Sequence, residues 1–343
     1  MTTPRIRFGM NIPGRRVGEF AEWLRLADEI DLDLIGVGDT PIQKHDIYVE
    51  LALAAQHTKR AMLGPWVTMP IVRHPMIAAS SIATIQELSG GRAFFGLGPG
   101  DVTIYEIGET GATMHGVAEY AMAVKGLCAG EVVEYQGKEL KLSWPELPAP
   151  VPVWLAGDGP RNLQMAGRIA DGVIAGNAAT KPLVEWAQRH VRQGAEEAGR
   201  DPSQIEMWYM VRVAPARTVQ EGIDSLAFYL ASYANVRFRH SMFDKGVAVD
   251  EDTAERIRGF RSEYRGDLSH RHELDHNVQL LKKYGLVQWL ADQFLITGPP
   301  ELCIERLREL IDAGATNFYV PLLLPDPMGK TRELAEMVYA AFR

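Results

Sequence analysis

Short apolar runs alternate with longer segments of helical hydrophobic spacing in the first third of the chain. The apolar runs have the length of buried strands, and we predict strands at residues 6–12, 32–38, 63–69 and 92–97. The segments between them carry apolar residues on one helical face, which predicts helices at residues 17–30, 47–57 and 77–88. Strands that alternate with helices in this order are typical of a parallel sheet covered by helices.

The alternation loosens after residue 101 and then resumes. A helix is predicted near residues 115–128, and the segment 132–142 alternates around Gln136-Gly137-Lys138, which indicates a surface hairpin. Further strands are predicted at 150–156, 172–175, 205–214 and 317–323, and further helices at 161–170, 183–198, 219–233, 300–313 and from about 331. The eight strands, centred near residues 6, 33, 66, 94, 153, 173, 208 and 319, predict an α/β fold of the (β/α)8 TIM-barrel type, with residues 1–343 as one domain.

One long segment does not follow the pattern. Residues 235–293 are charged and lack a strand pattern, so we predict a helical insertion before the last β/α unit of the barrel. Long insertions in compact enzymes are often lids over a site, and we expect this one to cover the substrate.

Composition and charge narrow the class of protein. The chain has 343 residues, of which 46% are hydrophobic and 23% charged, and its net charge is −8. This balance is that of a soluble globular protein and argues against a general nucleic-acid binder, which needs clustered Lys and Arg. No apolar run has membrane-spanning length. The first residues enter a strand without a signal peptide, and we therefore expect a cytoplasmic protein.

Neither cysteines nor histidines indicate a metal site. Cys128 and Cys303 match no disulfide framework or zinc spacing, and we interpret both as small buried side chains. His270, His272 and His276 lie in the charged insertion rather than at a strand end, so we interpret them as part of a solvated face. No metal is expected.

Polar residues follow the predicted strands at their carboxyl ends, where a barrel binds its ligands. They are Asn11, Asp39, Thr40, Thr68, Asp101, Asp158 and Asn177. Asp39 and Asp101 each end an apolar strand, where a buried carboxylate needs a partner. Both residues also suit the N-cap of the following helix, and position alone leaves these two interpretations open.

Two glycine-rich loops follow strands. In Gly98-Pro99-Gly100-Asp101 the glycines allow a backbone to approach a ligand closely. Gly157-Asp158-Gly159-Pro160-Arg161 opens a helix, whose first N–H groups and Arg161 suit a phosphate. An ordinary strand-to-helix turn is the alternative for the second loop.

Several motifs in order resemble one family. VTMPIVRHP, then ATIQELSGGRAFFGLGPGD and MAGRIADGVIAG, are similar to the luciferase-like family of flavin- and F420-dependent oxidoreductases, and within it to the methylenetetrahydromethanopterin reductase-like branch. The resemblance implies a TIM barrel and a hydride transfer between coenzyme F420 and a small organic substrate. It also implies a homodimer formed through barrel helices. Its alternative is an FMN-dependent monooxygenase of the same fold, which receives reduced flavin from a separate reductase.

The resemblance also implies the site residues. It assigns Asp39, Asp101 and Asn11 to catalysis. It assigns cofactor binding to Thr40, Trp66, Val67, Thr68, Gly98, Gly100, Gly157, Asp158, Gly159, Pro160, Arg161, Gly176 and Asn177. Family members carry a non-prolyl cis peptide in the third strand, which here would be Trp66–Val67, with Trp66 either packed on the cofactor ring or filling the barrel.

The sequence also departs from the family pattern. Asn11 stands where the reductase branch has glutamate, and an asparagine neither donates nor accepts a net proton. Thr40 replaces a histidine found in several F420 enzymes, which favours FMN, whereas the GPGD motif favours F420. Met69 replaces an asparagine whose amide could bond the cofactor.

Overall fold

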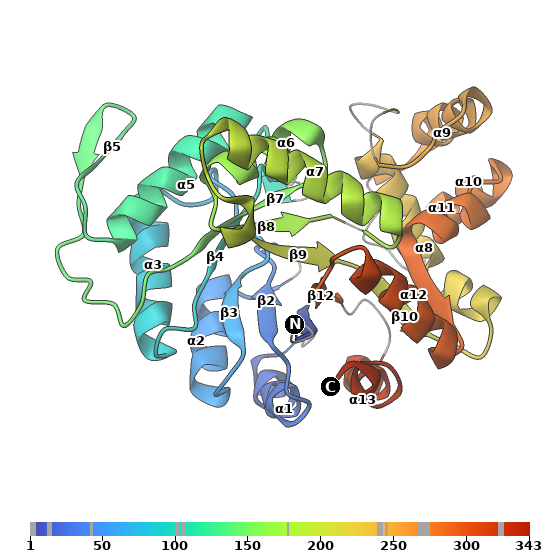
Figure 1. Ribbon diagram of the computed structural model, residues 1–343, viewed down its shortest axis with the longest axis horizontal. Coiled ribbons are helices and arrows are strands. Elements are labelled where there is room, and N and C mark those ends of the chain that lie inside the picture. The colour runs from blue at the N-terminus through green and yellow to red at the C-terminus, as the bar shows by residue number, and fades with distance from the viewer. Residues whose placement is uncertain are drawn as a thin grey trace.

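A closed parallel barrel forms the centre of the molecule in the computed structural model (Figure 1). The structure describes residues 5–11, 16–41, 44–100, 103–104, 107–176, 178–238, 243, 246–266, 275–321 and 326–343. The barrel strands are β1 (Arg7–Asn11), β2 (Leu34–Val37), β3 (Met62–Pro65), β4 (Phe95–Leu97), β7 (Val153–Gly157), β8 (Gly172–Ala175), β9 (Glu206–Met210) and β12 (Asn317–Tyr319).

The order of the strands confirms the predicted TIM barrel. Hydrogen-bonded neighbours run β3-β2-β1-β12-β9-β8-β7-β4, and every neighbouring pair is parallel. Two further parallel bridges, Leu63 to Ala93 and Thr68 to Leu97, join the outer strands β3 and β4. These bridges close the sheet on itself, which leaves no free edge.

Helices surround the strands (Figure 1). They are α1 (Val17–Glu29), α2 (Ile47–His57), α3 (Pro75–Leu88), α5 (Met114–Cys128), α6 (Pro160–Ile169), α7 (Lys181–Glu197), α8 (Val219–Arg237), α12 (Pro300–Asp312) and α13 (Pro327–Met337). Short 3-10 helices cover Pro202–Gln204 and Tyr339–Phe342. The predicted hairpin is present as the antiparallel pair β5 (Val133–Tyr135) and β6 (Lys138–Leu140), which projects from the barrel.

The insertion differs from the prediction at its start. Helix α8 continues to Arg237, beyond the predicted end at 233, because Ala234 and Arg237 are buried on its inner face and extend the helical pattern. The helices α9 (Glu251–Glu263), α10 (His276–Lys283) and α11 (Val287–Phe294) follow, and Figure 1 shows them together at one end of the molecule. Whether this segment covers a substrate stays a prediction.

The predicted strand 205–214 is two strands. The N–H of Val211 donates to the carbonyl of Tyr319 and ends the pairing of β9 with β12. The chain then continues as β10 (Arg212–Pro215), which pairs with β11 (Leu295–Gly298) in a separate two-stranded sheet. After β9 the chain therefore has a partner strand outside the eight-stranded sheet.

Large aromatic side chains fill the barrel because glycines on nearby strands leave room for them. The interior cluster includes Phe94, Trp154, Trp208 and Tyr319. A Cβ built on Gly64 would lie 2.2 Å from the carbonyl oxygen of Phe94. On other strands, a Cβ on Gly172 would lie 2.6 Å from the Trp154 ring, and one on Gly36 2.9 Å from the Tyr319 ring. Alternating small and large residues therefore give a solid floor rather than a pore.

We predict that Gly64→Ala destabilises the barrel by about 1–3 kcal/mol, because the added methyl group meets backbone that cannot move aside. Gly18→Ala on α1 is the matched control, since a Cβ there has nothing within 4 Å. The control should leave the free energy of unfolding unchanged or slightly raised. Denaturant titrations of both variants test this, and equal stabilities for the two would contradict the packing argument.

Candidate functional site

The strand-end residues predicted from the sequence do lie at the carboxyl end of the barrel. Asn11 ends β1, Asp39 and Thr40 follow β2, and Thr68 follows β3. Gly98 and Gly100 follow β4, Gly157 ends β7 and Gly176 follows β8. Asp101 and Asn177 lie outside the described residues. Because β1, β2, β3 and β4 adjoin β7 and β8 around the closed sheet, the described candidates share one region of the molecule.

The predicted cis peptide between Trp66 and Val67 is present. Hydrogen bonds between β3 and β4 flank it on both sides, from the Phe94 N–H to the Leu63 carbonyl at 2.9 Å and from the Thr68 N–H to the Gly96 carbonyl at 3.0 Å. Between these bonds the chain bulges toward β4, where a Cβ on Gly96 would lie 2.2 Å from the Pro65 carbonyl oxygen. A glycine at position 96 therefore permits the close approach of the two strands.

The same bulge occupies space beside the GPGD loop. A Cβ on Gly98 would lie 3.0 Å from a methyl carbon of Val67, and one on Gly100 would lie 2.4 Å from Ile104. Gly100 also has a φ of +97°, which favours glycine. In this structure both glycines are thus required by neighbouring protein atoms.

Trp66 packs on the barrel interior. Its ring stacks on Tyr319 with centroids 3.9 Å apart and planes 12° apart, and it meets Phe94 and Trp208 edge-on. Trp66 and Val67 are both half-buried at the top of this aromatic cluster. Of the two interpretations offered by the sequence, the structure shows that Trp66 fills the barrel, while its exposed part remains available to a ligand.

Asp39 is the centre of a polar network that joins β2 to the loop after β3. Its side chain is buried, and Oδ2 accepts hydrogen bonds from Thr68 Oγ1 at 2.6 Å and from Arg73 Nη1 at 2.5 Å. Arg73 Nη2 also donates to Asp46 Oδ2 at 2.8 Å, and Asp46 caps helix α2. Of the two open interpretations, capping does not hold, because Asp46 is the N-cap of α2; Asp39 is instead a buried carboxylate with the partners that such a group needs.

The loop after β7 has the features of an anion site. Helix α6 begins at Pro160 with Gly159 as N-cap, and no side chain caps its first N–H groups. Arg161 is exposed and makes no hydrogen bond or ion pair with the described residues. Gly176 lies against the loop, since a Cβ there would overlap the carboxylate of Asp158. Uncapped N–H groups and a free cation favour a bound phosphate.

Sequence reasoning missed one residue of this loop. Arg237, at the end of α8, is 4% exposed, and its Nη1 donates to the Asp158 carbonyl at 3.0 Å and lies 3.6 Å from Asp158 Oδ2. Burial lowers the pKa of Arg237, but neighbouring Tyr233 and Asp158 outweigh this and raise the pKa overall. The sequence placed Arg237 in a charged insertion, and only the tertiary contact shows its role.

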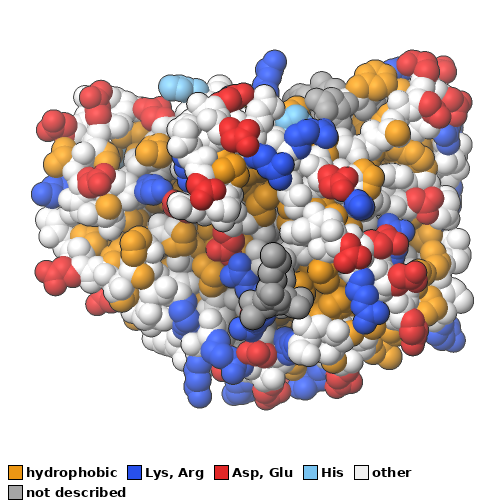
Figure 2. Space-filling view, in the orientation of Figure 1, with side chains coloured by type: hydrophobic (Ala, Val, Ile, Leu, Met, Phe, Trp, Pro, Cys, Tyr) orange, Lys and Arg blue, Asp and Glu red, His pale blue; other side chains and the backbone are white. Residues whose placement is uncertain are grey.

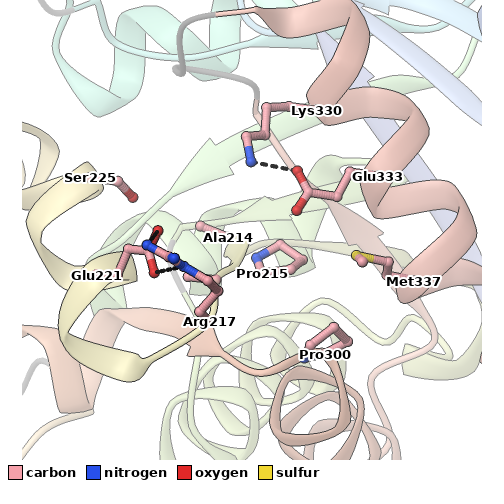
Figure 3. Close-up of a pocket in the computed structure, with 10 residues that line it drawn as sticks. Ala214, Pro215, Arg217, Glu221, Ser225, Pro300, Lys330, Glu333 and Met337 are labelled. Carbon is pink, nitrogen blue, oxygen red and sulfur yellow. Dashed lines mark hydrogen bonds and ion pairs between the residues drawn. The ribbon is translucent and has the colours of Figure 1, made fainter.

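Two cavities among the described residues lie in different places. A cavity of about 10 Å³ beside Gly157, Asp158, Gly176 and Arg237 has room for no more than one water molecule. A larger one of about 520 Å³ lies between β10 and the helices α8, α12 and α13. Figure 3 shows two ion pairs on its walls, Arg217 with Glu221 and Lys330 with Glu333. None of the predicted site residues lines it.

The two cysteines and possible clusters of metal-ligating side chains are the other candidates for redox or metal chemistry. Burial raises the pKa of Cys128 to about 12 and that of Cys303 to about 11, and both thiols are buried as predicted. In the part of the chain that the structure describes, no three His, Cys, Asp or Glu side chains are grouped as metal ligands.

Among the described residues, every helix is too short or too polar to cross a membrane. Figure 2 shows basic and acidic side chains interspersed over the visible face.

We predict a pH-dependent contribution of Asp46 to stability. Burial raises its pKa, but the hydrogen bond from Arg73 and the backbone N–H groups of Tyr48 and Val49 lower it below its usual value overall. Its contribution is therefore complete above the unfolded-state pKa of about 3.9 and is lost as the pH falls through the lower folded-state pKa.

Asp46→Asn isolates this charge, because asparagine keeps the N-cap. Wild type should be more stable than the variant at pH 7, and the difference should vanish in strong acid. Urea titrations across this pH range measure it. A difference that stays constant down to the lowest pH would show that the charge of Asp46 does not contribute.

Comparisons with known proteins agree on one family. The luciferase-like monooxygenase model matches residues 2–317. The 5,10-methylenetetrahydromethanopterin reductase of Methanolobus tindarius is 28% identical over 338 residues, which cover 96% of each chain. The F420-dependent glucose-6-phosphate dehydrogenase of Nakamurella multipartita is 27% identical, with 94% of this chain and 92% of that protein covered.

A solved structure gives the same fold. The coenzyme F420-dependent tetrahydromethanopterin reductase from Methanopyrus kandleri aligns with a TM-score of 0.76 at 24% sequence identity, over 99% of this chain and 100% of that chain. The family model spans most of the chain, and the relatives include reductases of the branch that its motifs resemble. The chain therefore belongs to the luciferase-like monooxygenase family.

Proposed function

We propose that this protein is an F420-dependent oxidoreductase that transfers a hydride between coenzyme F420 and a small organic substrate. The observation that carries the proposal is the carboxyl end of the barrel, where an apolar aromatic floor adjoins an uncapped helix N-terminus. Full-length relatives named as F420-dependent enzymes support it.

The residues present fit such a cofactor. A flat deazaflavin ring needs an apolar surface, which the half-buried Trp66 and Val67 supply above Tyr319. A phosphate-bearing tail needs N–H donors and a cation, which the start of α6 and Arg161 supply. When bound, F420 accepts or donates the hydride at C5 of its ring, and the protein positions the reactants and excludes water.

Each polar residue has a proposed task. Asp39 holds Thr68 and Arg73 in place and so fixes the loop that borders the cofactor. Asp101, which follows the GPGD glycines, accepts or donates the substrate proton. Asn11 orients the substrate without exchanging a proton. The 235–293 segment covers the substrate, and the cytoplasmic location expected from the sequence belongs to the same proposal.

Two relatives suggest the first substrates to assay. They are named for glucose 6-phosphate and for methylenetetrahydromethanopterin. Because Asn11 replaces the glutamate of the reductase branch, we expect the second compound to react poorly. A panel of small alcohols and carbonyl compounds extends the assay.

Cofactor titration tests the proposal. F420 and FMN absorb at different wavelengths, and either should quench the fluorescence of Trp66 if it binds above that ring. Saturable binding of F420 with weak binding of FMN supports the proposal. Tight FMN binding without F420 binding would establish the alternative, an FMN-dependent monooxygenase supplied by a separate reductase.

We predict that Arg161→Met weakens F420 binding about tenfold or more, because a charge-assisted hydrogen bond to the phosphate is lost. Arg168→Met is the matched control at the opposite end of the same helix, where Arg168 pairs with the exposed Glu197. The control should bind F420 as wild type does. Equal F420 affinities of the two variants would show that the cofactor phosphate does not bind at the start of α6.

We predict that Asp101→Asn lowers kcat about 10²–10⁴-fold with little change in F420 affinity, since it removes only proton transfer. Steady-state rates with the best substrate of the panel, together with the cofactor titration, measure both effects. An unchanged kcat would show that another group transfers the substrate proton.

We also propose a homodimer formed through α2 and α3. These helices pack side by side and carry one acidic residue each, Glu50 and Glu87, with no Lys or Arg. Their outer face exposes Val49 at 54%, Ile77 at 57% and Leu88 at 47%. Exposed apolar side chains on neighbouring helices with few charges are common at protein–protein interfaces.

We predict that Ile77→Arg converts the dimer to a monomer, because an unpaired charge would be buried in the interface. Val132→Arg, at a residue 58% exposed beside the β5 hairpin, is the control and should leave the mass unchanged. Light scattering after size-exclusion chromatography reads the mass. A monomeric wild type would refute the dimer.

A further inference from the structure

One buried cation is not used by any interaction described so far. Arg212, the first residue of β10, is 8% exposed. Its Nε and Nη1 atoms are enclosed and have no hydrogen-bond partner. Buried charged groups in proteins are normally paired or hydrogen-bonded, so an arginine in this state is an exception that needs a reason.

The side chain of Arg212 belongs to the inner face of its strand. Trp208 and Met210 lie in the aromatic cluster inside the barrel. Tyr209, Val211 and Val213, which alternate with them, pack in the outer core between strands and helices. Arg212 is the next residue in the row of Trp208 and Met210. It is also nearer than they are to the carboxyl end of the barrel, so it lies above the aromatic floor.

Its surroundings are aromatic. The guanidinium carbon lies 3.9 Å from the centroid of the Tyr229 ring on α8, a cation–π contact that orients the planar group without using its N–H donors. Burial raises the pKa of Tyr319, and the charge of Arg212 opposes that rise, so the two groups interact. Tyr319 in turn stacks on Trp66. The unpaired cation is therefore next to the proposed ring site.

Two other arginines at this end of the barrel, unlike the exposed Arg161, already have ion-pair partners. Arg73 pairs with Asp39 and Asp46, and Arg237 pairs with Asp158. Among the described residues, no carboxylate lies within ion-pair distance of Arg212. The cofactor phosphate has its own proposed donors at the start of α6, which leaves Arg212 for a second ligand.

We propose that Arg212 binds an oxyanion of the substrate, a carboxylate or a phosphate group, at the mouth of the barrel. This inference rests on the proposed function, since it places the substrate beside the cofactor ring. The planar guanidinium matches either group with two parallel hydrogen bonds, and the low exposure of the site strengthens them. The substrate class is then a small anionic alcohol or carbonyl compound.

The first test separates a binding role from a structural one. Arg212→Met removes a buried charge that no protein group compensates, so we expect a folded variant at least as stable as wild type. The matched control is Arg92→Met, because Arg92, which precedes β4, donates five hydrogen bonds to the end of α2, to the segment before β3 and to Ser89. The control should be strongly destabilised. A loss of stability in Arg212→Met equal to that of the control would overturn the proposal.

The second test measures binding without cofactor. Calorimetric titration with inorganic phosphate and with acetate, against chloride at equal ionic strength, should show saturable binding to wild type by at least one of the two anions. Binding should weaken ten- to a hundredfold in Arg212→Met, and less in Arg212→Lys, which keeps the charge but loses the planar fork. Failure of wild type to bind either anion, or equal binding by Arg212→Met, would refute the role.

The third measurement keeps this inference apart from the proposed function. F420 affinity in Arg212→Met should stay within about threefold of wild type, because the cofactor donors are elsewhere. If F420 binding is lost instead, Arg212 belongs to the cofactor site and the inference fails while the proposed function stands. If wild type binds phosphate or acetate but not F420, the cofactor assignment fails while the anion site stands.

Discussion

The close contact between β3 and β4 is the constraint on which the rest of this structure depends. The barrel is a closed sheet only because two bridges join these strands on either side of Trp66 and Val67. Glycine at position 96 lets the Pro65 carbonyl approach, and Val67 fills the space beside Gly98. The GPGD motif, which resembles a ligand loop, therefore also helps to close the barrel. The same contact between β3 and β4 places Trp66 above the aromatic interior.

Charge pairing organises the carboxyl end of the barrel around that contact. Arg73 ties the loop after β3 to Asp39, which follows β2, and Arg237 ties the loop after β7 to helix α8. Each pair fixes a loop that the proposed cofactor would touch. Arg212 is a buried arginine that lacks such a partner among the described residues, and we propose that the substrate rather than the protein supplies its counter-ion.

The positions of the barrel strands could be predicted from the sequence because strands buried on both faces are apolar runs. The strand 205–214 was the exception, since its division at Val211 depends on bonds to Tyr319 and β11, which are distant in sequence. Helix α8 was predicted too short because Asn235 and Arg237 interrupt the apolar pattern, although Arg237 is buried by an ion pair.

The candidate site was predictable only in part. Strand-end residues such as Asp39 and Thr68 follow from the fold, and the cis bond at Trp66–Val67 follows from the family resemblance, since nothing in those residue types indicates it. Arg237 and Arg212 could not be assigned, because the significance of each depends on which partners the folded chain supplies or withholds. For Arg212, the one signal in the sequence was an arginine inside an otherwise apolar strand.

The most direct measurement of the central claim is a structure of the protein with oxidised F420. The account predicts the deazaflavin ring against Trp66 and Val67, with the phosphate at Gly159 and Arg161. A ring bound in the cavity between α8 and α13, or a carboxyl end without cofactor at saturating concentration, would contradict it.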